Sequence, residues 1–241
     1  MQKFGVVTGA STGIGQAISV ELAKNGIFVA LVARTVDRLE KTKSLVERVG
    51  GKAEIFPTDL SKIESVNELI SKIKAKTNQV AVLVNVAGIW HGESEVFAGK
   101  DLEEFPQEVI LDTYTVGITA PTLLSHGLIP LMKPGSKIIN ISGTFESGAK
   151  GWVPYYVSKR AIEDLTIGLA EELKKKGIQV NCVSPSDTAT EAYKKYYPQY
   201  IEDSIAPEEI AKFVAKLYSQ GTTGKIFVIK KNKTPFVGFH K

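Results

Sequence analysis

Several features are scarce in this chain, and each absence excludes a class of protein. Cys182 is the only cysteine among 241 residues, so no internal disulfide can form, and we expect a reducing compartment, the cytoplasm. No apolar run approaches the ~18 residues of a membrane-spanning helix. The first residues already fit a strand, so we also expect no signal peptide.

Strong net charge is missing as well. The 30 basic and 26 acidic residues leave a net charge of +4, and the lysines are scattered along the chain. This distribution is typical of solvated helix faces rather than of a nucleic-acid-binding surface. We find no internal repeat and no low-complexity linker, and we assign no residue to a metal.

Short apolar runs alternate with helical spacing along the chain. After a first strand that ends near Thr8, further strands are expected at 27–32, 53–56, 80–84, 137–141, 178–183 and 225–229. Helices are expected at 36–49, at 61–77 with Ser61 as N-cap, at 101–132 with a break near 115–117, at 155–176 and at 207–219. Repeated βα units predict a parallel sheet whose ligand lies at the carboxyl ends of the strands.

A glycine-rich turn follows the first strand and opens the first helix. Glycine lets backbone turn tightly and approach a ligand closely, and the free amides at a helix start attract an anion. This arrangement suits a dinucleotide pyrophosphate. The residues expected to contact it are Gly9, Ser11, Thr12, Gly13, Ile14 and Gly15. Their spacing resembles the cofactor motif of the short-chain dehydrogenase/reductase family.

Two later motifs extend this resemblance over nearly the whole chain. The run from Asn85 through Ala87 and Gly88 resembles the family's Asn-Asn-Ala-Gly motif. Tyr155 and Lys159 follow at the family's Tyr-x-x-x-Lys spacing, which places both on one helix face. The fold is therefore expected to be α/β, a single Rossmann-type domain over 1–241 with a doubly wound parallel sheet and helices on both faces.

The resemblance implies three catalytic residues. Tyr155 would donate a proton to the oxygen formed by hydride transfer, and Lys159 would lower the pKa of Tyr155 and hold the nicotinamide ribose. A serine would polarise the carbonyl. Counting back 13 residues from Tyr155 gives Ser142, whereas counting forward from the strand gives Gly143. We choose Ser142, with Thr144 as a possible substitute.

Cofactor selectivity is expected from the end of the second strand. Ala33 stands where NAD-preferring family members carry Asp, and Arg34 offers a planar fork to a 2′-phosphate, which predicts NADPH. Asp59 and Leu60 match the family pair at the adenine edge. The alternative for Asp59 is that it only caps the next helix.

The chain also departs from the family pattern. Gly117 stands in place of an Asn that kinks the central helix and holds a water, so turnover could be slow or lost. Pro185 is followed by Ser186 where the family has Gly. These two residues, with Thr188 and Thr190, are expected to face the cofactor. Tyrosines in the expected substrate lid at about 188–206 either line an aromatic pocket or pack on the surface.

These observations predict an NADPH-dependent oxidoreductase that reduces a carbonyl to an alcohol, or runs the reverse reaction. The alternatives are a 3-oxoacyl-thioester reductase and a dinucleotide-binding regulatory protein with impaired catalysis. A small-molecule carbonyl or alcohol substrate is expected, with no membrane partner. The resemblance also implies a homodimer or homotetramer.

Overall fold

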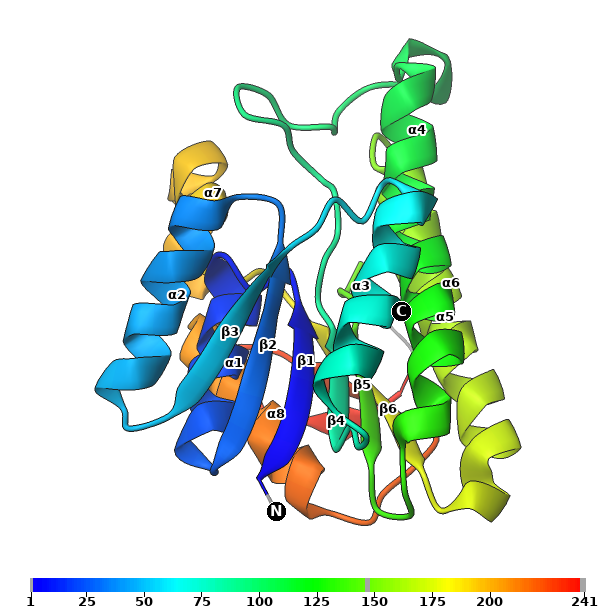
Figure 1. Cartoon of the computed structure of the whole chain (residues 1–241). Helices are drawn as coiled ribbons and strands as arrows, with labels where there is room; N and C mark the ends of the chain where they lie inside the picture. Colours follow the sequence, from blue (N-terminus) through cyan, green and yellow to red (C-terminus); the bar gives the residue numbers. More distant parts are fainter. Residues whose placement is uncertain (1, 146–147, 239–241) are drawn as a thin grey trace.

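A parallel sheet lies between two layers of helices (Figure 1). The computed structural model describes residues 2–145 and 148–238. In these residues the sheet has eight strands in the order β3-β2-β1-β4-β5-β6-β7-β8. All neighbours are parallel except β7 and β8. The predicted doubly wound α/β fold is therefore confirmed.

The strands are β1 (Lys3–Thr8), β2 (Ile27–Ala33), β3 (Lys52–Pro57), β4 (Val82–Asn85), β5 (Lys137–Ile141), β6 (Gln179–Pro185), β7 (Lys225–Ile229) and β8 (Phe236–Val237). The α-helices are α1 (Gly13–Lys24), α2 (Val36–Arg48), α3 (Ile63–Lys76), α4 (Gln107–Tyr114), α5 (Ala120–Leu128), α6 (Val153–Leu173), α7 (Glu191–Tyr196) and α8 (Pro207–Ser219).

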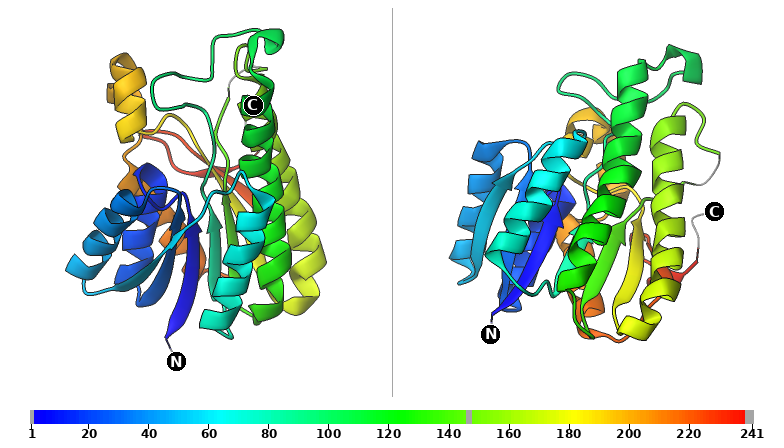
Figure 2. Two further views of the ribbon diagram at one scale, coloured as in Figure 1. Left: turned by 45° about the horizontal axis from the view of Figure 1, so that its top comes forward. Right: turned by 45° about the vertical axis from the view of Figure 1, so that its right-hand side comes forward.

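The sheet is buried on both faces, which explains its continuous apolar runs. Side chains alternate between the faces of a strand, so Val6 and Val7 of β1 enter different cores, and both are fully buried. Val6 packs in the core closed by α3, α5 and α6, and Val7 in the core closed by α1, α2 and α8. Figure 2 shows the helices on the two faces of the sheet. Each such side chain contributes about 1.5–3 kcal/mol through burial.

The strand order reverses beside β1, which pairs with β2 on one side and with β4 on the other. Loops from adjacent strands therefore part at the carboxyl end of β1, and this leaves a crevice suited to a ligand. This end of the sheet lies at the top of Figure 1, away from the N-terminus.

The helices predicted at 61–77 and 155–176 have different boundaries in the structure. Ser61 is not an N-cap, because α3 begins at Ile63 after Lys62. Instead the amide and hydroxyl of Ser61 both donate to Oδ1 of Asp59, at 3.0 and 2.9 Å. The predicted helix at 155–176 ends as α6 at Leu173 and closes with a 3-10 turn over Lys174–Lys176.

The predicted break near 115–117 is a π-helical turn, Thr115–Thr119, which joins α4 to α5. Such turns widen a helix by one residue and bend it locally. In the described part of the chain, no helix combines the length and apolar character needed to cross a bilayer.

Candidate active site

The turn between β1 and α1 requires glycine. Gly9 and Gly13 have φ angles of 65° and 55°, in the left-handed region that side chains disfavour. A Cβ on Gly15 would lie 2.2 Å from the carbonyl oxygen of Gly9. Thr12 precedes α1 without a side-chain cap, so the first amides of the helix remain available to an anion.

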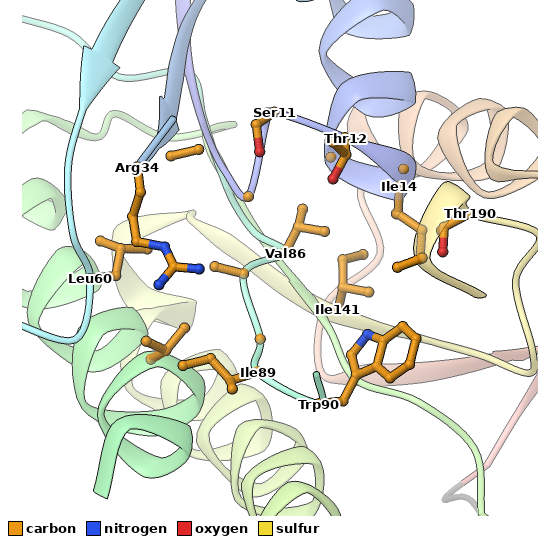
Figure 3. A pocket seen from close by; sticks show the side chains of 18 of the residues that line it. Ser11, Thr12, Ile14, Arg34, Leu60, Val86, Ile89, Trp90, Ile141 and Thr190 are labelled. Carbon is orange, nitrogen blue, oxygen red and sulfur yellow. The ribbon is translucent and has the colours of Figure 1, made fainter. Parts of the chain in front are cut away.

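A cavity of about 290 Å³, here called the cofactor cleft, runs along the carboxyl ends of the strands (Figure 3). Its predicted cofactor residues are Gly9, Ser11, Thr12, Gly13, Ile14, Gly15, Arg34, Asp59, Leu60, Ala87, Gly88, Lys159 and Thr190. Arg34 lies at one end of this cleft, with Trp90 and Thr190 toward the other (Figure 3). The cleft thus brings together residues that lie far apart in the sequence.

The Arg34 end is the basic end of the cleft. The guanidinium of Arg34 reaches into the space beside Leu60 (Figure 3). Arg38, from the first turn of α2, lines the same end and was missed by the sequence analysis, although its spacing of four from Arg34 was a usable signal. Asp59 lines this end too, but it does not cap α3. Its carboxylate accepts hydrogen bonds from Ser61, two residues later, in the turn before the helix.

Asn85 and Thr8 brace the strand ends behind the cleft. The Asn85 side chain is buried, and its Nδ2 donates to Oδ1 of Asn140 on β5 at 2.8 Å. Asn140 in turn donates to Thr166 of α6 at 2.9 Å. The hydroxyl oxygen of Thr8 accepts bonds from the amides of Val86 and Ala87, at 3.0 and 3.2 Å. Asn85 therefore ties β4 to β5 and through it to α6, whereas Thr8 holds the loop that borders the cleft.

Tyr155 and Lys159 lie in the first turns of α6 and both line the cofactor cleft. Lys159 is 4% exposed, and its Nζ donates to the carbonyl oxygen of Ile141 at 3.1 Å. The same Nζ lies 5.2 Å from the centroid of the Tyr155 ring. The ammonium is therefore held between the end of β5 and the face of the phenol.

Burial dominates the protonation of this pair. It raises the pKa of Tyr155 and lowers the pKa of Lys159 to about 8, a shift that Cys182 and Glu163 oppose. The sequence analysis expected Lys159 to lower the pKa of Tyr155. For the chain by itself that expectation is wrong, because desolvation of the phenol raises its pKa.

Ser142 is anchored by a buried acid. Its hydroxyl donates to Oε1 of Glu163 at 2.8 Å, and the other oxygen of Glu163 lies 3.1 Å from Nη1 of Arg160. Glu163 is completely buried. The sequence analysis missed Glu163, although it follows Lys159 at the same spacing of four residues that separates Lys159 from Tyr155.

Gly117 allows the π turn to lie against α6. A Cβ at this position would be 2.8 Å from Cβ of Ser158, between Tyr155 and Lys159. The Ser158 hydroxyl donates to the carbonyl oxygen of Tyr155 at 2.7 Å, so it also supports the first turn of α6. The glycine keeps the bend that the sequence analysis expected, and the close packing leaves no room for a larger residue.

A second cavity of about 760 Å³, here called the aromatic cavity, opens beyond Tyr155. Its lining includes Pro185, Ser186 and Thr188, three residues that were predicted to face the cofactor. The residues that line both cavities are Ile14, Trp90, Ser142, Tyr155 and Thr190. The predicted proton donor and the predicted polarising hydroxyl therefore lie where the two cavities meet.

A glycine turn at a sheet switch point, leading to a buried Tyr–Lys pair, defines a dinucleotide-dependent oxidoreductase type of site. The family model for short chain dehydrogenase matches residues 3–201. The chain belongs to this family of oxidoreductases.

Individual relatives agree with this assignment. A 3beta-hydroxysteroid dehydrogenase from Mediterraneibacter gnavus is 32% identical over 193 residues, covering 78% of this chain and 67% of that protein. A fatty acyl-CoA reductase from Acinetobacter baylyi is 31% identical over 221 residues, covering 88% and 71%. A short chain dehydrogenase from Burkholderia cenocepacia, solved with NADP, superposes with a TM-score of 0.84 at 25% identity, covering 95% of this chain and 97% of that one.

Proposed function

We propose that the protein is an NADPH-dependent carbonyl reductase, or an alcohol dehydrogenase when the reaction runs in reverse. The observation that carries this proposal is the position of Tyr155, which borders both the cofactor cleft and the aromatic cavity. Hydride transfer requires a nicotinamide on one side of the reacting carbon and a proton donor on the oxygen. The junction of the two cavities supplies a place for both.

The residues present fit NADPH. The amides at the start of α1 suit the pyrophosphate, and the guanidinium groups of Arg34 and Arg38 suit a 2′-phosphate. Ala33 lines the same end of the cofactor cleft and has no carboxylate group. When bound, the reduced nicotinamide would supply the hydride. The related structure from Burkholderia cenocepacia holds NADP, which supports the same choice here.

The chain's own residues would then handle the proton. Tyr155 is protonated near neutral pH, since burial raises its pKa above the already high value of about 10 for a free phenol, and it donates its phenolic proton to the new alcohol oxygen. Lys159 stabilises the phenolate that remains and holds the nicotinamide ribose. Gly88 leaves this ammonium accessible, since a Cβ there would lie 3.1 Å from Nζ of Lys159.

Ser142 is the proposed polarising hydroxyl, and Thr144 is its competitor. The Ser142 proton is donated to Glu163, so Ser142 must exchange that bond before it can donate to a substrate oxygen. Thr144 lines the aromatic cavity, and its amide donates to the carbonyl oxygen of Pro185 at 3.0 Å. Separate Ser142→Ala and Thr144→Val variants distinguish the two, because loss of a polarising donor lowers kcat by about a hundredfold or more.

The test of this function is NADPH oxidation with ketones, aldehydes, quinones and oxoacyl thioesters, with NADH in parallel. We expect turnover of at least one carbonyl class and a preference for NADPH. Tight NADPH binding without turnover of any class would contradict the enzyme assignment. Equal use of NADH and NADPH would contradict the role given to Arg34.

A dinucleotide-binding regulatory protein is the second candidate. It is favoured by the missing side chain at Gly117 and by the engaged hydroxyl of Ser142. A 3-oxoacyl-thioester reductase is a third, and the fatty acyl-CoA reductase among the relatives gives it some support. The thioester arm of the same substrate panel separates these candidates.

Three further features complete the proposal. Residues 188–206, which include α7, would form a substrate lid over the aromatic cavity. Leu111 of α4 and Val157 of α6 are exposed apolar side chains, consistent with a homodimer or homotetramer. We place the protein in the cytoplasm on the basis of its cysteine content.

A further inference from the structure

The aromatic cavity is walled by side chains from three separate segments. Trp90 comes from the loop after β4, Trp152 directly precedes α6, and Tyr197 follows α7. We call these three residues the aromatic clamp. They are half-buried, so part of each ring still faces open space. Half-buried aromatic rings that line a cavity indicate a ligand that covers them.

The three rings of the clamp face one another at similar spacings. Ring centroids are 6.4 Å apart for Trp90 and Trp152, 6.3 Å for Trp90 and Tyr197, and 6.2 Å for Trp152 and Tyr197. The planes are inclined by only 31° to 38°. Rings inclined this little to one another are nearer to parallel than to perpendicular, and a flat partner can add to such a group in an offset stack.

The clamp also lies beside the proposed reaction centre. The Trp152 ring is 6.1 Å from the ring of Tyr155. Trp90 lines both the cofactor cleft and the aromatic cavity. A carbonyl placed at the Tyr155 hydroxyl would therefore have its neighbouring carbon atoms against the clamp.

Hydrogen bonds hold the lid side of the clamp in place. The hydroxyl of Tyr196 donates to the carbonyl oxygen of Glu93 at 3.2 Å, and Nζ of Lys195 donates to the same oxygen at 2.9 Å. These contacts join α7 to the loop that carries Trp90. The Tyr193 ring lies 5.3 Å from the Tyr197 ring, with the two planes inclined by 37°.

Charge is balanced among the lining residues that the structure describes. There, Asp187 and Asp203 are matched by Lys230 and Lys231. Among the described lining residues, the aliphatic side chains are Ile14 and Pro185. A neutral flat molecule matches this lining better than a long acyl chain or an anion, because an acyl chain is best enclosed by aliphatic groups and an anion requires a net positive wall.

We propose, building on the carbonyl reductase function, that the substrate is a neutral fused-ring aromatic ketone that stacks on the aromatic clamp. The cavity of about 760 Å³ is in the range of sites for drug-sized ligands, about 300–1,000 Å³. In the reaction the carbonyl carbon gains a hydride from the reduced nicotinamide dinucleotide, which becomes oxidised. The C=O π bond breaks, and its oxygen takes the proton of Tyr155.

The test compares two ketones with the same carbon skeleton. β-Tetralone carries a flat aromatic ring, whereas β-decalone is saturated and puckered. We expect kcat/KM with NADPH to be about tenfold higher for β-tetralone, the effect of stacking on more than one ring. Tyr197→Leu should abolish this preference by lowering kcat/KM for β-tetralone, whereas Tyr197→Phe, which keeps the ring, should retain it.

Tryptophan fluorescence gives a second readout that needs no turnover. Trp90 and Trp152 are the chain's two tryptophans, so all of this emission comes from the clamp. We expect β-tetralone to quench it saturably in the Tyr155→Phe protein, and Tyr197→Leu to weaken that binding by about tenfold.

The outcomes separate this inference from the proposed function. Saturable quenching with no turnover of any ketone would support the ligand class and refute carbonyl reduction. Equal turnover of the two ketones, unchanged by Tyr197→Leu, would leave the reductase intact and overturn the clamp. Absence of quenching by β-tetralone would also overturn it.

Discussion

The cofactor cleft and the aromatic cavity meet at Tyr155 but are lined by different kinds of residue. The cleft is formed largely by backbone, glycines and short side chains at strand ends, such as Gly9, Gly13 and Ala87. The aromatic cavity is formed by large side chains on loops and on the short helix α7. A dinucleotide is constant and can be held by fixed backbone, whereas a variable substrate is selected by side chains that change without disturbing the sheet.

The largest effect is expected from adding one carbon atom to the glycine turn of the cofactor cleft. In Gly15→Ala the new Cβ would meet the Gly9 carbonyl oxygen, 2.2 Å away, so the turn must open. We expect NADPH affinity to fall by about a hundredfold, because two or more hydrogen bonds donated by backbone amides are lost. Calorimetric titration measures this affinity.

The matched control is Gly168→Ala in α6, where a Cβ would have no neighbour within 4 Å. It should bind NADPH like the parent protein and gain about 0.5–1 kcal/mol of stability, because alanine favours a helix. If Gly15→Ala bound NADPH equally well, the turn would not be the pyrophosphate site.

Arg34→Ala tests whether the basic end of the cofactor cleft selects NADPH over NADH. Loss of a charge-assisted bond to the 2′-phosphate should weaken NADPH binding by about tenfold to a hundredfold and leave NADH binding within about twofold. Arg48→Ala, at the last residue of α2, is the control for a general charge effect. Equal losses for both cofactors would mean that Arg34 acts only on the fold of the loop.

These two variants concern residues that the sequence could identify, and the reason is physical. The glycine turn is a local structure, so Gly9 through Gly15 carry their function in a short run whose geometry follows from the residue types. The Tyr155–Lys159 pair is visible for the same reason, since one helix turn relates its members. The strand and helix alternation followed likewise from local periodicity, and it predicted the fold.

The rest depended on tertiary packing. Nothing local relates Trp90 to Trp152 and Tyr197, which meet only when three segments fold over the strand ends. The direction of the Tyr155 pKa shift was mispredicted because it depends on how deeply the phenol is buried. Ser61 looked like a helix cap, but Asp59 captured both its amide and its hydroxyl and delayed the helix to Ile63.

The packing of the π turn against α6 can be tested at Gly117. Gly117→Asn would place its Cβ 2.8 Å from Cβ of Ser158, so we expect a loss of about 1–3 kcal/mol in unfolding free energy from overpacking. Adding Ser158→Gly to this variant should recover part of the lost stability, because it removes the atom that clashes. Denaturant titration of the two single variants and the double variant would measure this recovery as a coupling free energy. Strict additivity would show that the clash is relieved elsewhere.

The smallest expected effect is a pH dependence of stability. The pKa of Lys159 falls from 10.5 in the free side chain to about 8 in the folded chain. Between these values the unfolded chain keeps a proton that the folded chain has lost, so stability rises with pH. From pH 8 to 9 we expect a gain of about 1 kcal/mol. At higher pH the gain is opposed, because burial also raises the pKa of Cys182 from 9.0 to about 12.

The control is Lys159→Met, which has no titrating group at this site. Denaturant titration of the cofactor-free Lys159→Met protein should lack this gain over the same interval, and any decrease that remains belongs to groups such as Cys182. A curve for the parent protein that falls between pH 8 and 9 would contradict the assigned burial of the ammonium.

The central claim is that Tyr155 serves both cavities and donates the proton that completes the reaction. The most direct measurement compares Tyr155→Phe with its neighbour variant Tyr156→Phe, for NADPH binding, β-tetralone quenching and turnover of any ketone that the parent reduces. We predict that Tyr155→Phe keeps NADPH affinity within about twofold and loses at least about a hundredfold in kcat, whereas Tyr156→Phe keeps both. Undiminished turnover by Tyr155→Phe would contradict the account.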